Sequence, residues 1–261
     1  MNILDQIIAS KKKEIALKKS VLSIAQLENA ELFNKKTNSL SKSIRNLPFA
    51  IIAEHKRRSP SKATINNSFS VEEVVKGYEN GGASAISILT DTQYFGGSLE
   101  DLILARASVQ IPLLRKEFII DEYQLLEAKA FGADAILLIA AVLSKQEIKL
   151  LSEFAQSLAL EVLLEVHNLE ELEKSIMPSL DLIGVNNRNL KTFEVSLQNS
   201  IDLSNNIPND FVKISESGLT ATEDINLLKS HGFHGFLIGE NFMKTDNPGK
   251  SLEQFINQLK G

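Results

Sequence analysis

The stretch GGASAISIL at positions 81–89 decides the expected fold, because two similar stretches occur further along the chain. FGADAILLI occupies positions 131–139, and HGFHGFLIG occupies positions 231–239. Aligned on the glycine that is second in each, the three stretches are spaced by 50 and 100 residues. Each combines a glycine of the kind that ends a helix with a short apolar run of the kind that forms a buried strand. The spacing therefore predicts a repeated helix–strand unit.

Five further apolar runs complete the pattern. They are PFAIIAE (48–54), IPLLRK (111–116), LEVLLEV (160–166), LDLIGVN (180–186) and FVKISES (211–217). Short runs rich in Val, Ile and Leu are typical of a parallel sheet that is covered on both faces. Helical patterns separate the runs, and this alternation predicts parallel pairing. Eight such units within residues 48–261 predict an α/β fold, a closed (β/α)8 TIM barrel.

The alternative architecture is an open doubly wound sheet, which usually carries a glycine-rich phosphate loop after its first strand. That position holds EHKRRSPSK (54–62) in this chain, so the barrel is favoured. Residues 1–47 show apolar helical stripes and are predicted to be a helical extension packed on the barrel. The prediction is therefore a single domain over residues 1–261. Within the extension, Lys11, Lys12 and Lys13 are expected to form a solvated helix face.

Helix boundaries are predicted from capping signals. Four capping-box patterns occur, namely Ser70–Glu73, Ser98–Asp101, Ser144–Glu147 and Thr220–Glu223. In such a box the hydroxyl accepts a first-turn N–H, and the acid accepts the N–H of the cap residue. Gly81 and Gly232 are expected to end two helices as left-handed C-caps.

The overall composition excludes several classes of protein. The formal net charge is −5, whereas a general nucleic-acid binder is usually basic. No stretch reaches the ~20 apolar residues of a membrane-spanning helix, so no membrane role is expected. The segment 1–19 contains Asp5 and Glu14 and predicts an amphipathic helix rather than a signal peptide.

The chain contains no cysteine. This excludes disulfides, thiolate metal sites and a cysteine nucleophile. It agrees with a reducing compartment, and a cytoplasmic location is predicted.

Charged residues at the ends of alternate strands indicate a catalytic site. Active sites of TIM barrels lie at the C-terminal ends of the strands, and alternate strands contribute one layer of side chains. Glu54, Lys116, Glu165 and Glu216 end the first, third, fifth and seventh predicted strands. They are predicted to form one charged layer in which the lysine is protonated and one acid holds a proton. Such a layer suits acid–base chemistry.

A phosphate site is predicted beside this layer. The last two strands of many barrels end in loops that bind phosphate. Gly218 and Gly239 would allow an anion to approach backbone N–H groups. The side chain of Glu240 must then point away, so that its N–H binds the anion.

The histidines suggest no metal site. His55, His167, His231 and His234 are not clustered with other potential ligands in the sequence. All four are expected to be solvated, and no metal is predicted.

Seven segments resemble the motifs of the indole-3-glycerol-phosphate synthase family of tryptophan biosynthesis. In chain order they are IIAEHKRRSPSK (51–62), ISILTDTQYFGGSLEDL (86–102), PLLRKEFIIDEYQ (112–124), LLEVHNLEEL (163–172), IGVNNRNLKTF (183–193), ISESGL (214–219) and LIGENFM (237–243). The resemblance implies a TIM barrel without metal or organic cofactor. It also implies conversion of 1-(2-carboxyphenylamino)-1-deoxyribulose 5-phosphate, a phosphosugar-anthranilate compound, to indole-3-glycerol phosphate, carbon dioxide and water.

The resemblance also implies roles for individual residues. The catalytic positions are Glu54, Lys56, Lys116, Glu165, Asn186, Glu216 and Ser217. The substrate- and phosphate-binding positions are Ser59, Arg188, Gly218, Gly239 and the N–H of Glu240. Lys116 is the expected acid for ring closure, while the later proton transfers stay divided among Glu165, Glu54 and Lys56. Asn241-Phe242 departs from the family pattern, in which small or aliphatic residues are commoner.

Two other functions are considered. Phosphoribosylanthranilate isomerase is a phosphosugar barrel that uses a cysteine base, which this chain lacks. A non-catalytic phosphate-binding or assembly barrel that partners other tryptophan-pathway enzymes would not need to keep the charged layer. The intact layer favours the synthase.

Overall fold

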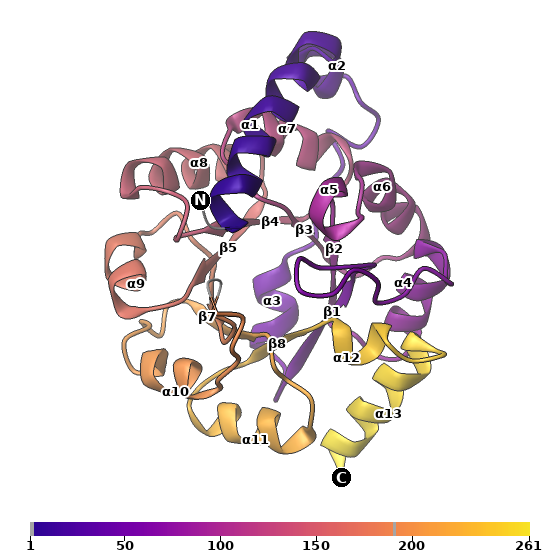
Figure 1. The fold of residues 1–261 in the computed structure, drawn as a ribbon, viewed down its shortest axis with the longest axis vertical. Coiled ribbons are helices and arrows are strands. Elements are labelled where there is room, and N and C mark those ends of the chain that lie inside the picture. Colours follow the sequence, from indigo (N-terminus) through magenta and orange to yellow (C-terminus); the bar gives the residue numbers. More distant parts are fainter. Residues whose placement is uncertain (1–2, 190–191) are drawn as a thin grey trace.

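The predicted barrel is confirmed by the structure, a computed structural model that describes residues 3–189 and 192–261. The strands are β1 (Ala50–His55), β2 (Ala85–Leu89), β3 (Leu113–Lys116), β4 (Ala135–Ile139), β5 (Glu161–Val166), β6 (Leu182–Asn186), β7 (Val212–Glu216) and β8 (Gly235–Ile238). Each pairs in parallel with its neighbours, and β1 pairs with β8 to close the barrel (Figure 1).

Helices surround the strands, and helices of the N-terminal extension lie at both ends of the barrel (Figure 1). The outer helices are α4 (Val71–Asn80), α6 (Leu99–Ser108), α7 (Glu122–Ala130), α8 (Lys145–Ser157), α9 (Leu169–Ser175), α10 (Gln198–Ser204), α11 (Thr222–Ser230) and α13 (Pro248–Lys260). The extension contributes α1 (Ile3–Val21), α2 (Ile24–Glu28) and α3 (Leu40–Arg45), and two short helices are α5 (Thr92–Phe95) and α12 (Glu240–Met243). None of the helices in the described part of the chain is long and apolar enough to cross a membrane.

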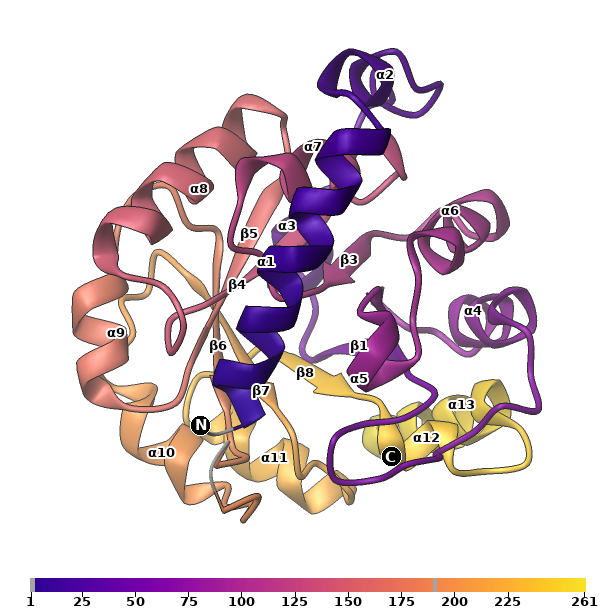
Figure 2. The ribbon, with the colours of Figure 1, turned by 45° about the horizontal axis from the view of Figure 1, so that its top comes forward.

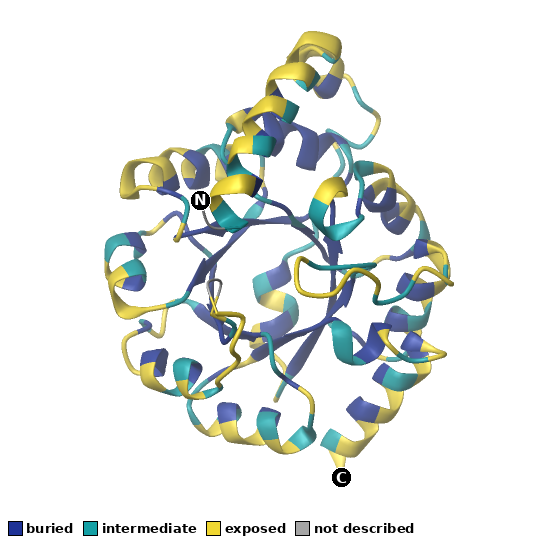
Figure 3. Ribbon diagram, in the orientation of Figure 1, coloured by how far each residue is buried: buried dark blue, intermediate teal, exposed yellow. Residues whose placement is uncertain are grey.

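The strands are buried on both faces, as their continuous apolar runs predict (Figure 3). The outer faces pack against the ring of helices, whose exposed sides face solvent. Inside the barrel, Leu40 and Ile44 of α3 join the apolar side chains of the strands. Helix α3 thereby closes the N-terminal end of the barrel, so a substrate must approach from the opposite end.

Helix α1 lies over that opposite end, where the strands terminate (Figure 2). Ile3, Leu4 and Ile7 face the cavity enclosed by the strand ends. Further along the extension, Ile15 and Leu27 are buried against α7. The extension is therefore packed on the barrel, as its apolar stripes predict.

The glycines that align the repeats serve as turns from helix to strand. Gly82, Gly132 and Gly232 have φ values of +93°, +86° and +82°, which only glycine adopts readily. The expectation that Gly81 is left-handed is wrong, because its φ is −75°. Its N–H still donates to the carbonyl of Gly77, so the chain leaves the helix one residue later, at Gly82.

Three of the four predicted helix starts are confirmed. Ser70 and Ser144 form complete capping boxes. Ser98 caps α6, but the Asp101 carboxylate does not complete a box. It binds the guanidinium of Arg57 instead, in a bidentate pair.

The fourth predicted start, at Thr220, is wrong. Helix α11 begins at Thr222, and Ala221 is its N-cap residue. The carboxylate of Asp224, rather than Glu223, accepts the N–H groups of Ala221 and Thr220. An alanine side chain cannot accept a hydrogen bond, so Ala221 does not cap the first turn. Only the other half of the capping box forms, in which Asp224 accepts the backbone N–H of Ala221.

Candidate active site

The charged layer predicted from the alternate strands is present at the mouth of the barrel. Each charged residue follows, by two positions, a residue that packs inside the barrel: Ile52, Leu114, Leu163 and Ile214. Because side chains two apart on a strand share a face, Glu54, Lys116, Glu165 and Glu216 also point inward. All four line a cavity of about 500 Å³.

Lys116 is the centre of the charged layer. Its ammonium donates to Glu216 Oε2 and lies 3.5 Å from Glu165 Oε2. Burial opposes the charged form, but the carboxylates of Glu216, Glu165 and Glu54 outweigh it and hold the pKa of Lys116 above its ordinary value. Lys116 is therefore held in its protonated form, in agreement with the predicted charged layer.

Glu216 is the acid that retains a proton near neutrality. Burial raises its pKa, Lys116 opposes that rise, and the negative charges of Glu165 and Glu54 add to it. The result is a pKa of about 7 instead of 4.5. The prediction that one acid of the layer would be protonated is therefore supported for Glu216.

The pKa of Glu54 is shifted in the opposite direction from that of Glu216. Burial disfavours its charge, but Lys56 and Lys116 outweigh burial and lower the pKa of its carboxyl group. Lys56 Nζ lies 2.7 Å from Glu54 Oε1, so the two side chains share a face as their spacing predicts. The site thus combines a carboxylate that stays ionised with one that can be neutral.

Two glycines make room for these carboxylates. A Cβ added at Gly184 on β6 would overlap Glu216 Oε1. A Cβ added at Gly239 would lie 2.5 Å from Glu54 Oε1. Gly239 is thus required by the neighbouring acid, a reason that the sequence did not reveal.

The remaining predicted residues line the same cavity. From the β6 end come Asn186 and Arg188, from the β7 end Ser217 and Gly218, and from the rim Ser59, Gly239 and Glu240. Ser217 and Gly218 have φ values of +68° and +76°, so the chain turns sharply after β7. The Glu240 carboxylate lies 3.0 Å from Lys62 Nζ on the rim. Every residue predicted for the site is thereby brought to one cavity.

The two residues of the unusual Asn241-Phe242 pair lie in different places: Asn241 lines the cavity, and Phe242 lies in the core. Phe242 is fully buried and packs edge-on against Tyr78 and Phe255. Asn241 lines the cavity and donates to the carbonyl of Thr220. The aromatic residue therefore fills the space between the outer helices and leaves the cavity itself unchanged.

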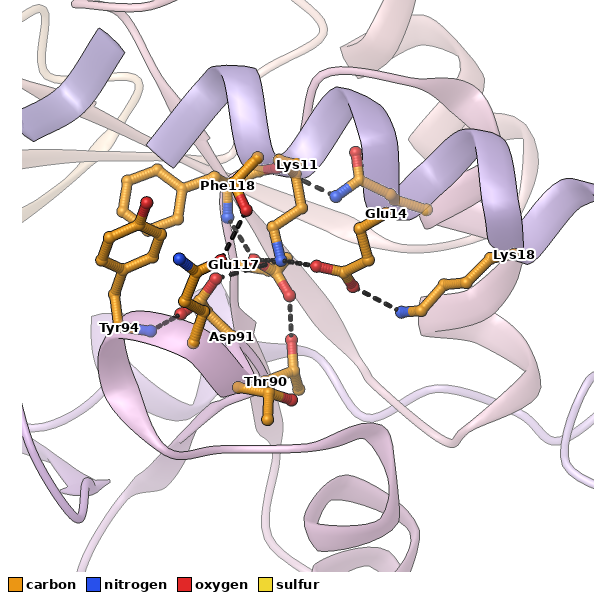
Figure 4. A network of polar contacts seen from close by, with 12 residues as sticks. Lys11, Glu14, Lys18, Thr90, Asp91, Tyr94, Glu117 and Phe118 are labelled. Atoms are coloured by element: carbon orange, nitrogen blue, oxygen red, sulfur yellow. Dashed lines mark hydrogen bonds and ion pairs between the residues drawn. The ribbon is translucent and has the colours of Figure 1, made fainter. Parts of the chain in front are cut away.

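Lys11 is a buried residue that the sequence interpretation placed in solvent (Figure 4). Its ammonium lies 2.7 Å from Glu14, 3.1 Å from Asp91 and 3.1 Å from Glu117. Burial opposes its charge, but these carboxylates raise its pKa above the ordinary value. Only Lys12 and Lys13 are exposed as predicted.

The surroundings of Lys11 connect α1 to the strand ends. Glu117 follows Lys116 directly, and its other oxygen accepts the hydroxyl of Thr90. Thr90 in turn accepts from Arg115 on the outer side of β3. A sequence signal did exist, since Ile7, Lys11 and Ile15 are spaced by four and share the buried face of α1.

The prediction that all four histidines are solvated is wrong for His55 and His167. His55 is only 1% exposed, because the outer face of β1 is covered by helices. Burial and the charge of Arg57 lower its pKa to about 4. His234 is exposed as expected, and His231 is half-buried.

His167 lies beside the charged layer. Its Nδ1 is 3.3 Å from Glu171 Oε2, and its Nε2 is 3.5 Å from Glu165 Oε1. The sequence signal was its position two residues beyond Glu165, on the same strand face if the strand is extended. No group of three His, Asp or Glu side chains suited to a metal ion occurs within residues 3–189 and 192–261.

Apolar side chains also line the cavity. Phe118, Phe95, Leu137 and Ile139 are among them, together with residues of the first turns of α1. A protonated amine, a neutral carboxyl group and an ionised carboxylate thus share the cavity with apolar side chains. This arrangement can bind an aromatic anion and transfer protons to and from it.

Sequence comparison agrees with this chemistry. A sequence model described as indole-3-glycerol phosphate synthase matches residues 4–255. The indole-3-glycerol phosphate synthase of Bacteroides thetaiotaomicron is 48% identical over 259 residues, covering 99% of both chains. That of Polynucleobacter necessarius is 42% identical over 265 residues, covering 98% of this chain and 99% of its own.

Structural comparison identifies the fold only. The alpha subunit of tryptophan synthase from Legionella pneumophila has a TM-score of 0.62 at 13% identity, covering 86% of this chain and 98% of that one. Thiamine phosphate pyrophosphorylase from Pyrococcus furiosus has a TM-score of 0.60 at 15% identity, covering 85% and 98%. Both likenesses support the barrel.

Proposed function

Because the chain belongs to the indole-3-glycerol phosphate synthase family, whose members are carboxy-lyases of tryptophan biosynthesis, we propose that Lys116 is the general acid of its reaction. That reaction converts 1-(2-carboxyphenylamino)-1-deoxyribulose 5-phosphate to indole-3-glycerol phosphate, carbon dioxide and water. The observation that carries the proposal is the buried ammonium of Lys116 between Glu216 and Glu165.

Ring closure is the first step. The aromatic carbon that bears the carboxylate attacks the sugar carbonyl, and the carbonyl oxygen takes a proton as the new bond forms. Lys116 supplies this proton from a site of low exposure, where a positioned acid contributes typically ~10²–10⁴-fold to the rate. The neighbouring carboxylates then stabilise the return of a proton to the amine.

Decarboxylation and dehydration follow. Loss of carbon dioxide restores the aromatic ring, and loss of water needs an acid for the leaving hydroxyl and a base for a proton. Glu165, Glu54 and Lys56 are the candidates for these transfers. Glu165 is supported by its place 3.5 Å from Lys116, and Glu54 by its ion pair with Lys56.

Substrate binding uses both charged ends of the cavity. Lys56 faces the anthranilate carboxylate, while Asn186 and Glu216 hold the sugar hydroxyls. The substrate- and phosphate-binding groups are Ser59, Arg188, Gly218, Gly239 and the N–H of Glu240. The helix that starts at Glu240 leaves its first N–H groups without intrahelical acceptors, which supports anion binding there.

A turnover assay tests the proposal. The chain contains no tryptophan, so indole fluorescence reports the product without background from tryptophan side chains. Lys116→Ala is expected to lower kcat by about 10²–10⁴-fold. The control is Lys149→Ala, which removes an exposed lysine on α8. A Lys116→Ala enzyme with wild-type kcat would remove Lys116 from the mechanism.

The same assay tests the competing functions. A phosphate-binding or assembly barrel would bind the substrate without forming indole product, and an isomerase would act on the aminoribosyl precursor.

A cytoplasmic location belongs to the proposal and is supported by the lack of cysteine. Association with other enzymes of the pathway is also part of the proposal. An apolar surface is available for it on the extension, where Leu17, Val21 and Ile24 are exposed.

A further inference from the structure

The proposed reaction consumes a proton, and this inference rests on that proposed function. The substrate carboxylate is ionised at neutral pH and leaves as neutral carbon dioxide. The departing hydroxyl leaves as water, and the phosphate is unchanged. Charge therefore balances only if one proton enters the active site from solution in each turnover. Bound substrate would fill the cavity beneath α1, so a path outside that cavity is needed.

His167 lies where such a path would begin. Its side chain is only 12% exposed, and it stands between Glu165 and Glu171. Its Nδ1 lies 3.3 Å from Glu171 Oε2, whereas its buried Nε2 has no hydrogen-bond partner among the described residues. That nitrogen is 3.5 Å from Glu165 Oε1. A small movement of either side chain would therefore complete the contact.

A second cavity, of about 920 Å³, adjoins the active-site cavity, and Leu4, Asn186 and Arg188 line both. His167 and Glu171 line it, whereas Glu165 lines the active-site cavity. A row of four acid–base groups thus leads from the second cavity to the active-site cavity: Glu171, His167, Glu165 and Lys116. Its contacts are 3.3, 3.5 and 3.5 Å long.

The charges around His167 favour its protonated form. Burial lowers its pKa, but the hydrogen bond with Glu171 and the charges of Glu165, Glu171 and Glu216 outweigh burial and raise it. The other charged groups of the second cavity are Asp5 and Lys12 of α1, and Arg188 and Glu194 after β6. An imidazolium is therefore available as a donor near neutral pH.

We propose that His167 relays protons from the second cavity to Glu165, and so supplies the proton that each turnover consumes. In the transfer, the Nε2–H bond of the imidazolium breaks and an O–H bond forms on Glu165. The ring becomes neutral and keeps its Nδ1 proton. It then turns about its Cβ–Cγ bond, presents the bare Nε2 to the second cavity, takes a proton from hydronium or a buffer acid in the solution, and turns back. Glu165 passes its proton to Lys116 or to the substrate, which returns the row to its starting state.

Three variants test the relay. His167→Ala removes the carrier, and His167→Gln keeps a polar side chain that cannot carry a proton. His234→Ala is the control, because His234 is exposed and has no part in the proposed relay. Both His167 variants are expected to lower kcat by about 10²-fold with little change in KM. Free imidazole should restore kcat of His167→Ala in proportion to its concentration, whereas His234→Ala stays unaffected by it.

Proton uptake provides the second measurement. With a pH-indicator dye in stopped flow, wild-type protein should take up its proton at the rate of product formation, and the His167 variants should be limited by uptake. Wild-type kcat in His167→Gln, or a loss in His167→Ala that imidazole does not restore, would overturn the relay. Circular dichroism of each variant separates these results from misfolding. If the wild-type protein forms no indole product, the proposed function itself fails, which is a different outcome.

Discussion

At the scale of single residues, Glu216 shows how burial and neighbouring charges together determine the pKa of an acid. Its folded pKa of about 7 lies above the ordinary 4.5, so protonation accompanies folding. The stabilisation is complete below the unfolded pKa and is lost as the pH rises through about 7. The difference between the two pKa values corresponds to about 3 kcal/mol.

Glu216→Gln is therefore expected to remove this pH dependence. Denaturant titrations from pH 4.5 to 8 should show the free energy of unfolding of the wild type falling by up to about 3 kcal/mol relative to the variant. The amide keeps the shape and stays neutral at every pH. Parallel curves for the two proteins would show that Glu216 is ionised throughout this range.

Lys11 offers a second test at this scale. Lys11→Met removes the ammonium from the buried carboxylates of Asp91 and Glu117, although Arg115 remains 3.7 Å from Glu117, and breaking a buried pair costs about 3–5 kcal/mol. The matched control is Lys13→Met on the exposed face of the same helix, which should change stability by less than about 0.5 kcal/mol. Chemical denaturation measures both, and equal effects would contradict the buried network.

The residue-level predictions succeeded where strand alternation applied. Glu54 and Lys116 follow apolar residues that were recognisable as strand interior, so their direction was predictable. Lys11 was missed because a run of three lysines is usually solvated. Its partners at positions 91 and 117 lie far along the chain, and their proximity is not a local property.

At the scale of elements, the boundaries depend on which hydroxyl caps each helix. Ser144 accepts a first-turn N–H of α8, whereas Thr220 precedes α11 without capping it. The same pattern of hydroxyl and acid thus has two outcomes. It failed at Thr220 because the chain continues extended for one further residue before turning into the helix.

Ser144→Ala is expected to cost about 1 kcal/mol, the usual loss for an N-cap. Thr220→Ala, the comparison, should cost clearly less, because Asp224 keeps its bonds to the backbone. Thermal or urea unfolding of the two variants decides the point. A larger loss for Thr220→Ala would mean that α11 begins earlier than the structure indicates.

The long strands and helices were predictable because their patterns extend over many residues. Helices α5 and α12 have four residues each, too few for a periodic signal. Asp91 caps helix α5 by accepting the backbone N–H groups of Tyr94 and Phe95. Short elements of this kind are determined by their contacts with the barrel.

At the scale of the whole molecule, the extension and the barrel share a buried interface. Lys11 binds residues at the ends of β2 and β3, and Tyr123 on α7 donates to the carbonyl of Leu22. We therefore propose that residues 1–261 form a single domain. Its extension should unfold together with the barrel.

A site-specific label tests this cooperativity. The chain has no cysteine, so Lys13→Cys accepts a single dye on the exposed face of α1. Urea unfolding followed by the dye and by circular dichroism should give coincident midpoints. An earlier transition of the dye would show that the extension unfolds separately, and labelled Lys149→Cys serves as the barrel control.

The sequence by itself determined the eight-stranded barrel, the end that holds the site and the inward direction of its charged residues. These follow from period-two and helical patterns, which are encoded locally. Only the tertiary structure decided that burial raises the pKa of Glu216, that Lys11 is buried and that His167 lies beside Glu165. Those properties depend on desolvation and on distances between residues 100 or more positions apart, such as Lys116 and Glu216, which come together only when the barrel closes.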